Sequence, residues 1–352
     1  MTAVHRRAGL AALAVTALTL AACGGSDDPA ALPTAPSTGQ ATGQPTEAEA
    51  TREVTLMLNW TPNAHHVGVF AALQQGWYEQ AGIDLTVIEP ADAGVEQAVA
   101  TGAADLGMAQ AESLLPARAA GVPVVSVATV LPVNDSSLFS LADDRITRPR
   151  DLQGTRYGGF GGALETEIIS ALMRCDGADP DTVEFVTLGN IDYLAGMDAD
   201  QFDTAWVFSG WDALRAEQVA GVEVEQIRFA DWADCIPNWF TPLFLASEST
   251  VADDPGLVED FLAVTARGYE LAVADPAQAA GLLLEQVPEL DSALVEPSVA
   301  YYAPLFVGDA GTWGVQDEQT WMQFADFLTS SGVSDEEVDG ASAFTNEYLP
   351  GG

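Results

Sequence analysis

The stretch NWTPNAHH at residues 59–66 brings aromatic, amide and imidazole side chains together. Adjacent histidines could serve a metal site or acid–base chemistry, whereas Asn amides and a Trp ring could bind a flat, nitrogen-containing ring. A metal needs more ligands than two neighbouring histidines supply, and the sequence has only one further His, His5. We therefore expect neither a metal nor a catalytic residue here, and for this stretch ligand binding and a structural role both stay open at this point.

Each residue of this stretch also has a structural interpretation. Trp60 could belong to the core or offer a stacking face. Asn59 and Asn63 could bind the donors and acceptors of a heteroaromatic ring, or cap the turn around Pro62. His66 begins a helix in our interpretation and could donate to the ligand or bond to the backbone, whereas we expect His65 to be exposed or structural.

A second candidate is the glycine-rich stretch YGGFGG at residues 157–162. Gly158, Gly159, Gly161 and Gly162 around Phe160 would let the backbone approach a ligand at the N-terminus of the next helix, although a plain turn is the alternative.

Three further side chains could complete a ligand site. Glu112 and Glu165 could each pair with amino groups of a ring or lie in solvent. Trp211 follows a predicted strand and could form the opposite wall. Trp206 lies within that strand and is expected in the core, and Trp239 is a weaker candidate.

The N-terminus has the features of a secretory signal. Arg6 and Arg7 precede an apolar run that is too short to span a membrane. The run ends in LAAC at Cys23 and resembles the lipobox of bacterial lipoproteins, which implies residues 1–22 as signal peptide and a lipidated Cys23. Residues 23–52 are rich in Gly, Ser, Pro, Thr and Ala, which predicts a disordered tether.

The composition excludes several functions. The 352 residues include 52 Asp or Glu and 12 Lys or Arg, all of them Arg, for a net charge of −40. Such a charge disfavours nucleic acid and anionic membrane surfaces as partners, and salt adaptation is another explanation for it. Without lysine there is no Schiff-base chemistry with pyridoxal phosphate, and we expect no cofactor. Few arginines lie near the candidate stretches, which argues against a strongly anionic ligand.

Two cysteines remain beside Cys23. Outside the cytoplasm, an even remainder favours a disulfide between Cys175 and Cys235, although two buried free thiols are the alternative.

The elements that position these residues alternate between strand and helix from residue 53 to about 250, and helices follow. This order predicts an α/β protein with mostly parallel sheets and helices on both faces. We expect two lobes joined by crossover strands near 137–141 and 243–247, with a ligand cleft between them. The expected boundaries are 53–138 plus 246–352 for lobe 1 and 139–245 for lobe 2.

Four stretches resemble one family of solute-binding proteins and enzymes. They are LNWTPNAHHVGVFAA, AADLGMAQAESLLPARAAGVPVVSVATVL, YGGFGGALETEII and AFTNEYLP. They are similar to the thiamine-precursor group, which includes formylaminopyrimidine-binding lipoproteins of ABC importers and the fungal hydroxymethylpyrimidine phosphate synthase. The resemblance covers residues 53–350 and implies the type II-like periplasmic-binding-protein fold.

The resemblance carries over residue by residue. It places Asn59, Trp60 and His66 at the cleft, with Gly158–Gly162 and Glu165 beside them. The lysine and histidine that the fungal enzyme uses align with Ala109 and Ser113, and its cysteine-rich run aligns with residues 236–240 (IPNWF), so the enzymatic residues are missing.

The resemblance implies a monomeric, lipid-anchored receptor at the outer face of the cell membrane. It would bind a thiamine pyrimidine precursor and deliver it to the permease and ATPase of an ABC transporter. Riboflavin or another flat aromatic solute is the alternative ligand. A secreted pyrimidine-processing enzyme and a lipoprotein that only docks a partner are alternatives from other classes.

Overall fold

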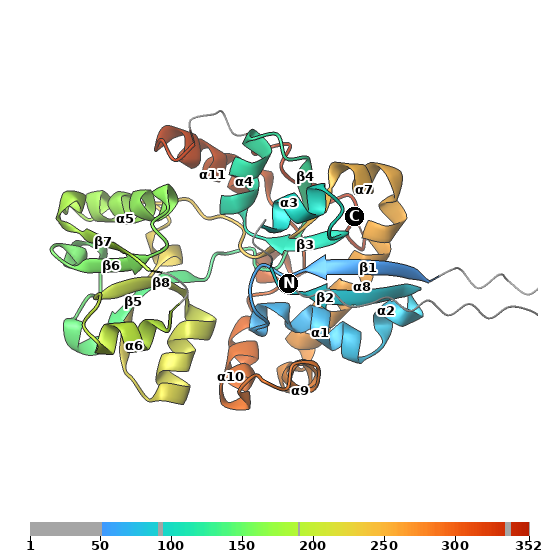
Figure 1. Cartoon of the computed structure of the whole chain (residues 1–352), viewed down its shortest axis with the longest axis horizontal. Helices are drawn as coiled ribbons and strands as arrows, with labels where there is room; N and C mark the ends of the chain where they lie inside the picture. Colours follow the sequence, from blue (N-terminus) through green and yellow to red (C-terminus); the bar gives the residue numbers. More distant parts are fainter. Residues whose placement is uncertain (1–50, 91–93, 189–190, 335–338, 352) are drawn as a thin grey trace, which may run out of the picture. The chain divides into compact units, whose positions relative to one another are not determined.

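The chain forms two five-stranded mixed sheets (Figure 1). The computed structural model describes residues 51–90, 94–188, 191–334 and 339–351. The expected signal peptide, Cys23 and the tether up to residue 50 lie outside this range. Helices in the described residues are all too short or too polar to cross a membrane.

The first sheet has the order β2-β1-β3-β10-β4. Strands β1, β2 and β3 are parallel, and β10 runs antiparallel to both of its neighbours. Every residue of β10 and β4 is buried, as expected for strands that are covered on both faces. The strands are β1 (Arg52–Met57), β2 (Ile83–Ile88), β3 (Leu106–Ala109), β4 (Val124–Thr129) and β10 (Leu243–Ser247).

The second sheet has the order β7-β6-β8-β5-β9, and β5 is its antiparallel strand. Its edge strand β7 is mostly exposed or half-buried. The sequence did not predict β6, whose glycines were interpreted as a loop. The strands are β5 (Ser136–Leu141), β6 (Arg156–Gly159), β7 (Glu184–Thr187), β8 (Thr204–Phe208) and β9 (Val224–Arg228).

Helices cover both faces of each sheet (Figure 1). The first sheet has α3 and α4 on one face and α1 and α8 on the other, and α5 and α6 lie on opposite faces of the second sheet. The α-helices are α1 (Val67–Gln74), α2 (Trp77–Gln80), α3 (Val95–Ala100), α4 (Ala111–Ala119), α5 (Ala163–Cys175), α6 (Tyr193–Asp198), α7 (Glu248–Asp253), α8 (Pro255–Ala274), α9 (Pro276–Gln286), α10 (Ser292–Tyr302) and α11 (Glu318–Ser330).

The C-terminal helices begin where the sequence places capping residues. Asp254 and Asp275 each accept a backbone N–H of the first turn, and each is followed by a proline at the first helical position. Both features stabilise a helix start. Short 3₁₀ helices span Ala64–His66, Ala142–Asp144, Pro149–Leu152, Pro180–Thr182, Phe229–Trp232 and Gly308–Ala310, and π-helical turns span Ser209–Ala213 and Arg215–Ala220.

The chain passes between the sheets just before β5 and again before β10. The lobe boundaries expected at 138/139 and 245/246 therefore fall inside strands, and the passages lie at residues 130–135 and 233–242. β5 and β10 are complete members of their sheets because backbone hydrogen bonding, which sequence patterns do not specify, continues along each of them.

Candidate functional site

A cavity of about 440 Å³ lies where strands of both sheets end. Residues that follow β1 and β3 line it from the first sheet, and residues that follow β6 and β8 line it from the second. The carboxyl ends of strands in α/β sheets are the usual place for ligands. The lining residues are Asn59, Trp60, Asn63, His65, Gln110, Glu112, Tyr157, Gly158, Gly159, Phe160, Gly162, Leu164, Glu165, Tyr193, Trp206, Val207, Phe208, Trp211 and Asp212.

The NWTPNAHH stretch orients the amide of Asn59. The backbone N–H of Asn63 donates to Nδ1 of His66 at 3.0 Å, so the ring proton must be on Nε2. That Nε2–H then donates to Oδ1 of Asn59 at 2.9 Å. With its oxygen used in this way, Asn59 has its two amide N–H donors left for a ligand.

His66 does not line the cavity, contrary to our expectation. Its ring is fully buried, and burial lowers its pKa to about 3. The reason is the 3₁₀ turn at Ala64–His66, capped by Asn63, which turns His66 back towards the backbone of Asn63. The ring of His66 therefore bonds to Asn59, which lines the cavity, and is not itself among the lining residues.

His65, which we expected to be exposed or structural, is a buried residue of the cavity wall. Its ring packs against Phe208 and Tyr302 at centroid distances of 4.9 and 4.4 Å. Burial, with a smaller effect of neighbouring His66, lowers its pKa to about 3. Among the described residues its Nε2 has no hydrogen-bond partner.

Asn63 lines the cavity, but its amide serves the local turn. Its Oδ1 accepts the backbone N–H of His65 at 2.9 Å, and its Nδ2 donates to the carbonyl of Thr61 at 3.1 Å. Of the two interpretations of Asn63, the structure therefore supports capping.

Aromatic rings form much of the cavity wall. Trp60 follows β1 and Phe160 follows β6, and their rings meet edge to face at a centroid distance of 6.5 Å. Both rings remain exposed, at 43% and 56%, so a ligand could cover them further. Trp211 lines the cavity as predicted.

Trp206 also lines the cavity, whereas Trp239 does not. We expected Trp206 in the core, but it and Phe208 share one face of β8 and both are only partly buried. Their spacing of two residues was the signal that could have identified them. Trp239 instead stacks on Phe324 at 4.9 Å inside the core.

The glycine-rich loop is held by Glu165. One carboxylate oxygen accepts the hydroxyl of Tyr157 at 2.9 Å and the N–H of Phe160 at 3.0 Å, and the other accepts the N–H of Gly162 at 2.9 Å. Glu165 lines the cavity, but these bonds give it the role of shaping the loop.

Gly159 lines the cavity as predicted, and Gly161 does not. A Cβ at Gly159 would lie 2.5 Å from Glu165 Oε1 and from the Tyr157 ring, so only glycine fits there. Gly161 has a φ of +81° and faces Thr187. The turn at Gly161 directs this residue away from the cavity, and Gly162 lines it instead.

Glu112 contributes a carboxyl group to the cavity wall. It lies in the first turn of α4, and its Oε2 is buried with no hydrogen-bond partner among the described residues. Burial raises its pKa to about 8, and the charge of Glu96 adds to this effect. The indole of Trp239 lies close by, outside hydrogen-bond geometry.

Asp212, a half-buried residue on the side of the second sheet, adds another carboxyl group to the cavity wall. Burial raises its pKa to about 6, and its Oδ2 accepts the backbone N–H of Phe208 at 3.3 Å. Gln110, Tyr157, Leu164, Tyr193 and Val207 also line the cavity and were not predicted. Gln110 directly follows β3 and Val207 lies near the end of β8, whereas Tyr157 lies inside β6, and Leu164 and Tyr193 lie in the first turns of α5 and α6.

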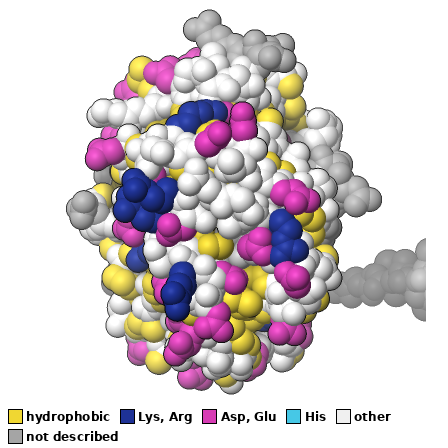
Figure 2. Space-filling model, turned by 90° about the vertical axis from the view of Figure 1, so that its left-hand side faces the viewer, with side chains coloured by type: hydrophobic (Ala, Val, Ile, Leu, Met, Phe, Trp, Pro, Cys, Tyr) yellow, Lys and Arg dark blue, Asp and Glu magenta, His cyan; other side chains and the backbone are white. Residues whose placement is uncertain are grey.

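The described residues that line this cavity include no arginine. Two arginines on the side of the second sheet are bonded to surface acids: Arg156 to Asp200 and Asp203, and Arg215 to Asp192. Figure 2 shows this face, where dark blue side chains lie beside magenta ones. In the described part of the chain, no group of three His, Cys, Asp or Glu residues is placed to hold a metal ion.

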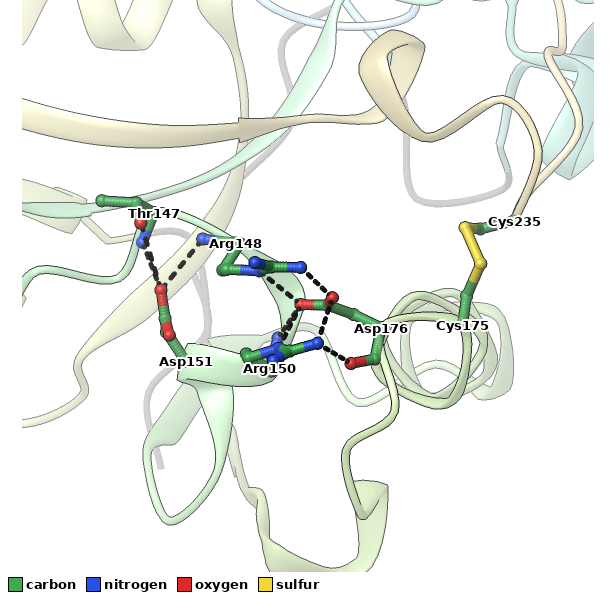
Figure 3. Close-up of polar contacts among 7 residues, drawn as sticks. All are labelled: Thr147, Arg148, Arg150, Asp151, Cys175, Asp176 and Cys235. Atoms are coloured by element: carbon green, nitrogen blue, oxygen red, sulfur yellow. Dashed lines mark hydrogen bonds and ion pairs between the residues drawn. A yellow bond between two sulfur atoms is a disulfide. The ribbon is translucent and has the colours of Figure 1, made fainter.

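Cys175, the last residue of α5, forms a disulfide with Cys235, which precedes β10 (Figure 3). Their Cα atoms are 5.7 Å apart, within the usual range. The adjacent Asp176 is almost completely buried and accepts hydrogen bonds from Arg148 and Arg150. These arginines hold the pKa of Asp176 well below its usual range.

Comparison with known proteins places the chain in a family. The family described as NMT1/THI5 like matches residues 63–279. A 4-amino-5-hydroxymethyl-2-methylpyrimidine phosphate synthase of Legionella pneumophila is 28% identical over 84% of this chain and 92% of its own. A formylaminopyrimidine-binding protein of Halalkalibacterium halodurans is 24% identical over 87% and 93%. The riboflavin-binding protein RibY of Chloroflexus aurantiacus is 28% identical over 92% of each chain.

Solved structures show the same fold. The alkanesulfonate-binding protein SsuA of Xanthomonas axonopodis superposes with a TM-score of 0.66 at 19% identity, over 85% of this chain and 99% of its own. The aliphatic sulphonate-binding protein SsuA of Escherichia coli gives 0.64 at 16% identity, over 85% and 94%. The protein thus has the bilobal fold of periplasmic binding proteins, and since the family match covers more than half of its sequence, it belongs to the NMT1/THI5-like family.

Proposed function

We propose that the protein is a solute-binding receptor of an ABC importer, and that its cavity binds a thiamine pyrimidine precursor such as hydroxymethylpyrimidine or formylaminopyrimidine. The observation that carries this proposal is Oε2 of Glu112, a buried carboxyl oxygen in an aromatic cavity that has no hydrogen-bond partner among the described residues. A buried polar group without a partner lowers stability, so a ligand that satisfies it gains affinity.

An aminopyrimidine suits this carboxyl group. Its edge carries a ring nitrogen, which accepts a hydrogen bond, next to an amino group, which donates one. A protonated carboxyl group offers one donor and one acceptor side by side, and with a pKa of about 8 Glu112 is mostly protonated at pH 7. The free N–H donors of Asn59 and the carboxyl group of Asp212 could bind the ring's other substituents.

The charge of the cavity favours a neutral ligand over the sulfonates that the two solved relatives bind. Glu112, Glu165 and Asp212 line it, and none of the lining residues in the described part of the chain is an arginine. Anion-binding sites rely on charge-assisted hydrogen bonds from arginine or lysine. A sulfonate or phosphate group would therefore enter without a counter-charge.

The residues that this chain has at the catalytic positions of the fungal enzyme also support binding without catalysis. Ala109 is a buried residue at the end of β3, and the hydroxyl of Ser113 donates to Glu96. Trp239, within the stretch that replaces the cysteine-rich run, is packed in the core. None of these side chains offers a nucleophile to the cavity. We expect no turnover.

Riboflavin is the second candidate. The cavity volume of about 440 Å³ lies within the range of drug-sized ligand sites, and the relative RibY is named for riboflavin. The uracil-like edge of a flavin also places an N–H donor beside carbonyl acceptors, which a protonated Glu112 could bind.

The proposed location follows from the N-terminal sequence. Lipidation of Cys23 would hold the receptor, as a monomer, at the outer face of the cell membrane, where it could deliver its ligand to a permease and ATPase. Cys23→Ser should move the protein from the detergent phase to the aqueous phase in a Triton X-114 separation. An unchanged partition would contradict the lipid anchor.

Isothermal titration with hydroxymethylpyrimidine, formylaminopyrimidine, riboflavin and an alkanesulfonate tests the proposal. We expect one of the pyrimidines to bind most tightly and to remain chemically unchanged after incubation. A ligand at about 100 times its Kd adds roughly 2.7 kcal/mol to stability if only the folded state binds. Preferred binding of riboflavin would establish the alternative, and binding of none of these rings or turnover of any would refute the proposal.

A further inference from the structure

A buried carboxylate lies where the chain first passes from one sheet to the other. Asp135 is 4% exposed and ends the passage at residues 130–135. Its Oδ1 accepts the hydroxyl of Tyr301 at 2.7 Å, and its Oδ2 accepts the hydroxyl of Tyr302 at 3.0 Å and the backbone N–H of Gly210 at 2.8 Å. Arg228 is 3.9 Å away. Three hydrogen bonds therefore converge on one side chain.

These donors come from two different parts of the molecule. Tyr301 and Tyr302 lie on α10, whose buried residues belong to the core of the first sheet. Gly210 belongs to the π-helical residues 209–220 after β8, which we call the wall segment. Figure 1 shows this segment in yellow beside α10. Asp135 thus bonds the wall segment and α10 at once.

The backbone of Asp135 adds to this connection. Its carbonyl accepts both the N–H and the hydroxyl of Ser209, each at 3.1 Å. A Cβ at Gly210 would lie 2.4 Å from the rings of Tyr301 and Tyr302. The wall segment therefore approaches α10 so closely that only glycine fits at residue 210.

The wall segment carries Trp211 and Asp212 into the cavity. π-Helical turns are rare and depend on their surroundings, so the segment needs tertiary contacts to hold this geometry. We infer that Asp135 is a positioning residue, which holds the wall segment on α10 and so keeps the cavity closed around its ligand. Its effect on a ligand rests on the proposed function, whereas its effect on the segment does not.

Hydrogen–deuterium exchange on the ligand-free protein tests the connection. Asp135→Asn replaces one acceptor oxygen by an NH₂ group, which is a donor and cannot bond to the N–H of Gly210. We expect faster exchange in residues 209–220 and 292–302, with little change elsewhere. Asp176→Asn is the matched control, because Asp176 is equally buried, accepts several hydrogen bonds and lies outside the cavity wall. It should speed exchange only around residues 148–152 and 163–176.

Ligand dissociation supplies the second readout, measured by stopped flow with hydroxymethylpyrimidine. We expect Asp135→Asn to raise the dissociation rate about tenfold, the size of effect that loss of one buried hydrogen bond produces, and Asp176→Asn to leave it unchanged. Tyr301→Phe removes one donor from a half-buried position and should give a smaller rise even if Asp135→Asn does not fold.

Equal effects of Asp135→Asn and Asp176→Asn on dissociation, or unchanged exchange in residues 209–220, would overturn the inference. If exchange responds as expected but the wild-type protein binds no pyrimidine, the connection stands and the proposed function fails. The two ideas are therefore tested separately.

Discussion

At the scale of single residues, the two adjacent histidines have the opposite positions to those that we expected from the sequence. His65 forms the cavity wall, and His66 orients Asn59 from behind. If an α-helix began at His66, we would expect the ring of His66 at the cavity and the ring of His65 away from it. Because the turn at Ala64–His66 is a 3₁₀ helix, the side chains rotate by more per residue than in an α-helix. The order of the two rings could not be predicted from spacing alone.

Substitution of each histidine tests this assignment. His66→Ala leaves the buried N–H of Asn63 unpaired and should destabilise the fold by about 1–3 kcal/mol. His65→Ala enlarges the cavity and should weaken pyrimidine binding at least as much as His66→Ala does. Urea unfolding and isothermal titration measure the two effects. If His65→Ala leaves the affinity unchanged, its ring is not part of the working site.

Glu112 makes stability depend on pH. Its pKa rises from 4.5 in the unfolded chain to about 8 in the folded protein. The folded state thus keeps a proton that the unfolded state releases, so the contribution of this group is complete below pH 4.5 and is lost as the pH rises towards 8. The slope reaches at most about 1.4 kcal/mol per pH unit.

Glu112→Gln removes this titration. We expect its free energy of unfolding to fall less between pH 5 and pH 8 than that of the wild type, as measured by urea unfolding at each pH. Glu217→Gln, at an exposed position, is the control. Pyrimidine affinity of the wild type should also decline above pH 8, as the O–H donor is lost. A variant that follows the wild-type pH profile would show that Glu112 does not hold the proton.

At the scale of elements, the alternating pattern predicted the order of strands and helices, and α5 (Ala163–Cys175) begins directly after the glycine-rich stretch, where a helix was expected. The pattern failed at β6 and at the wall segment. Arg156–Gly159 becomes a strand because β7 and β8 bond to it from both sides, which local propensity does not show. The wall segment has an ordinary helical composition, and its π-helical winding accompanies contacts with α10 and Asp135.

A substitution in the glycine-rich loop tests how the shape of this element affects binding. Gly159→Ala would place a Cβ against Glu165 and Tyr157, and both side chains form the hydrogen bonds that shape the loop. We expect Kd for the pyrimidine to rise roughly 5- to 150-fold, from a steric cost of about 1–3 kcal/mol. Gly281→Ala is the control: it lies in α9 with open space around it and should slightly stabilise the protein. Equal titration curves for both variants would mean that the loop tolerates a change of shape.

At the scale of the whole molecule, ligand binding requires that two sheets keep a common cavity, and the chain crosses between them only at residues 130–135 and 233–242 among the described residues. At the end of the first passage, Asp135 accepts the backbone N–H of Gly210. Near the start of the second, the disulfide of Cys235 links the passage to α5. The sequence indicated the disulfide through its even cysteine count, but a buried carboxylate bonded by three donors follows only from the fold. Interactions at both passages thus limit how the two sheets can move.

The disulfide is tested by removing it. The bond closes a loop with a sequence separation of 60 residues, and the loss of chain entropy in the unfolded state gives it a stabilising effect of about 4 kcal/mol at most. The double variant Cys175→Ser, Cys235→Ser should therefore unfold at lower urea, whereas pyrimidine affinity at low temperature should change little, because neither cysteine lines the cavity. Mass spectrometry of the unreduced, alkylated wild type should find no alkylated thiol at either position. Alkylation of both cysteines would contradict the bond, and a large loss of affinity in the stable fraction of the double variant would show that the second passage also positions the site.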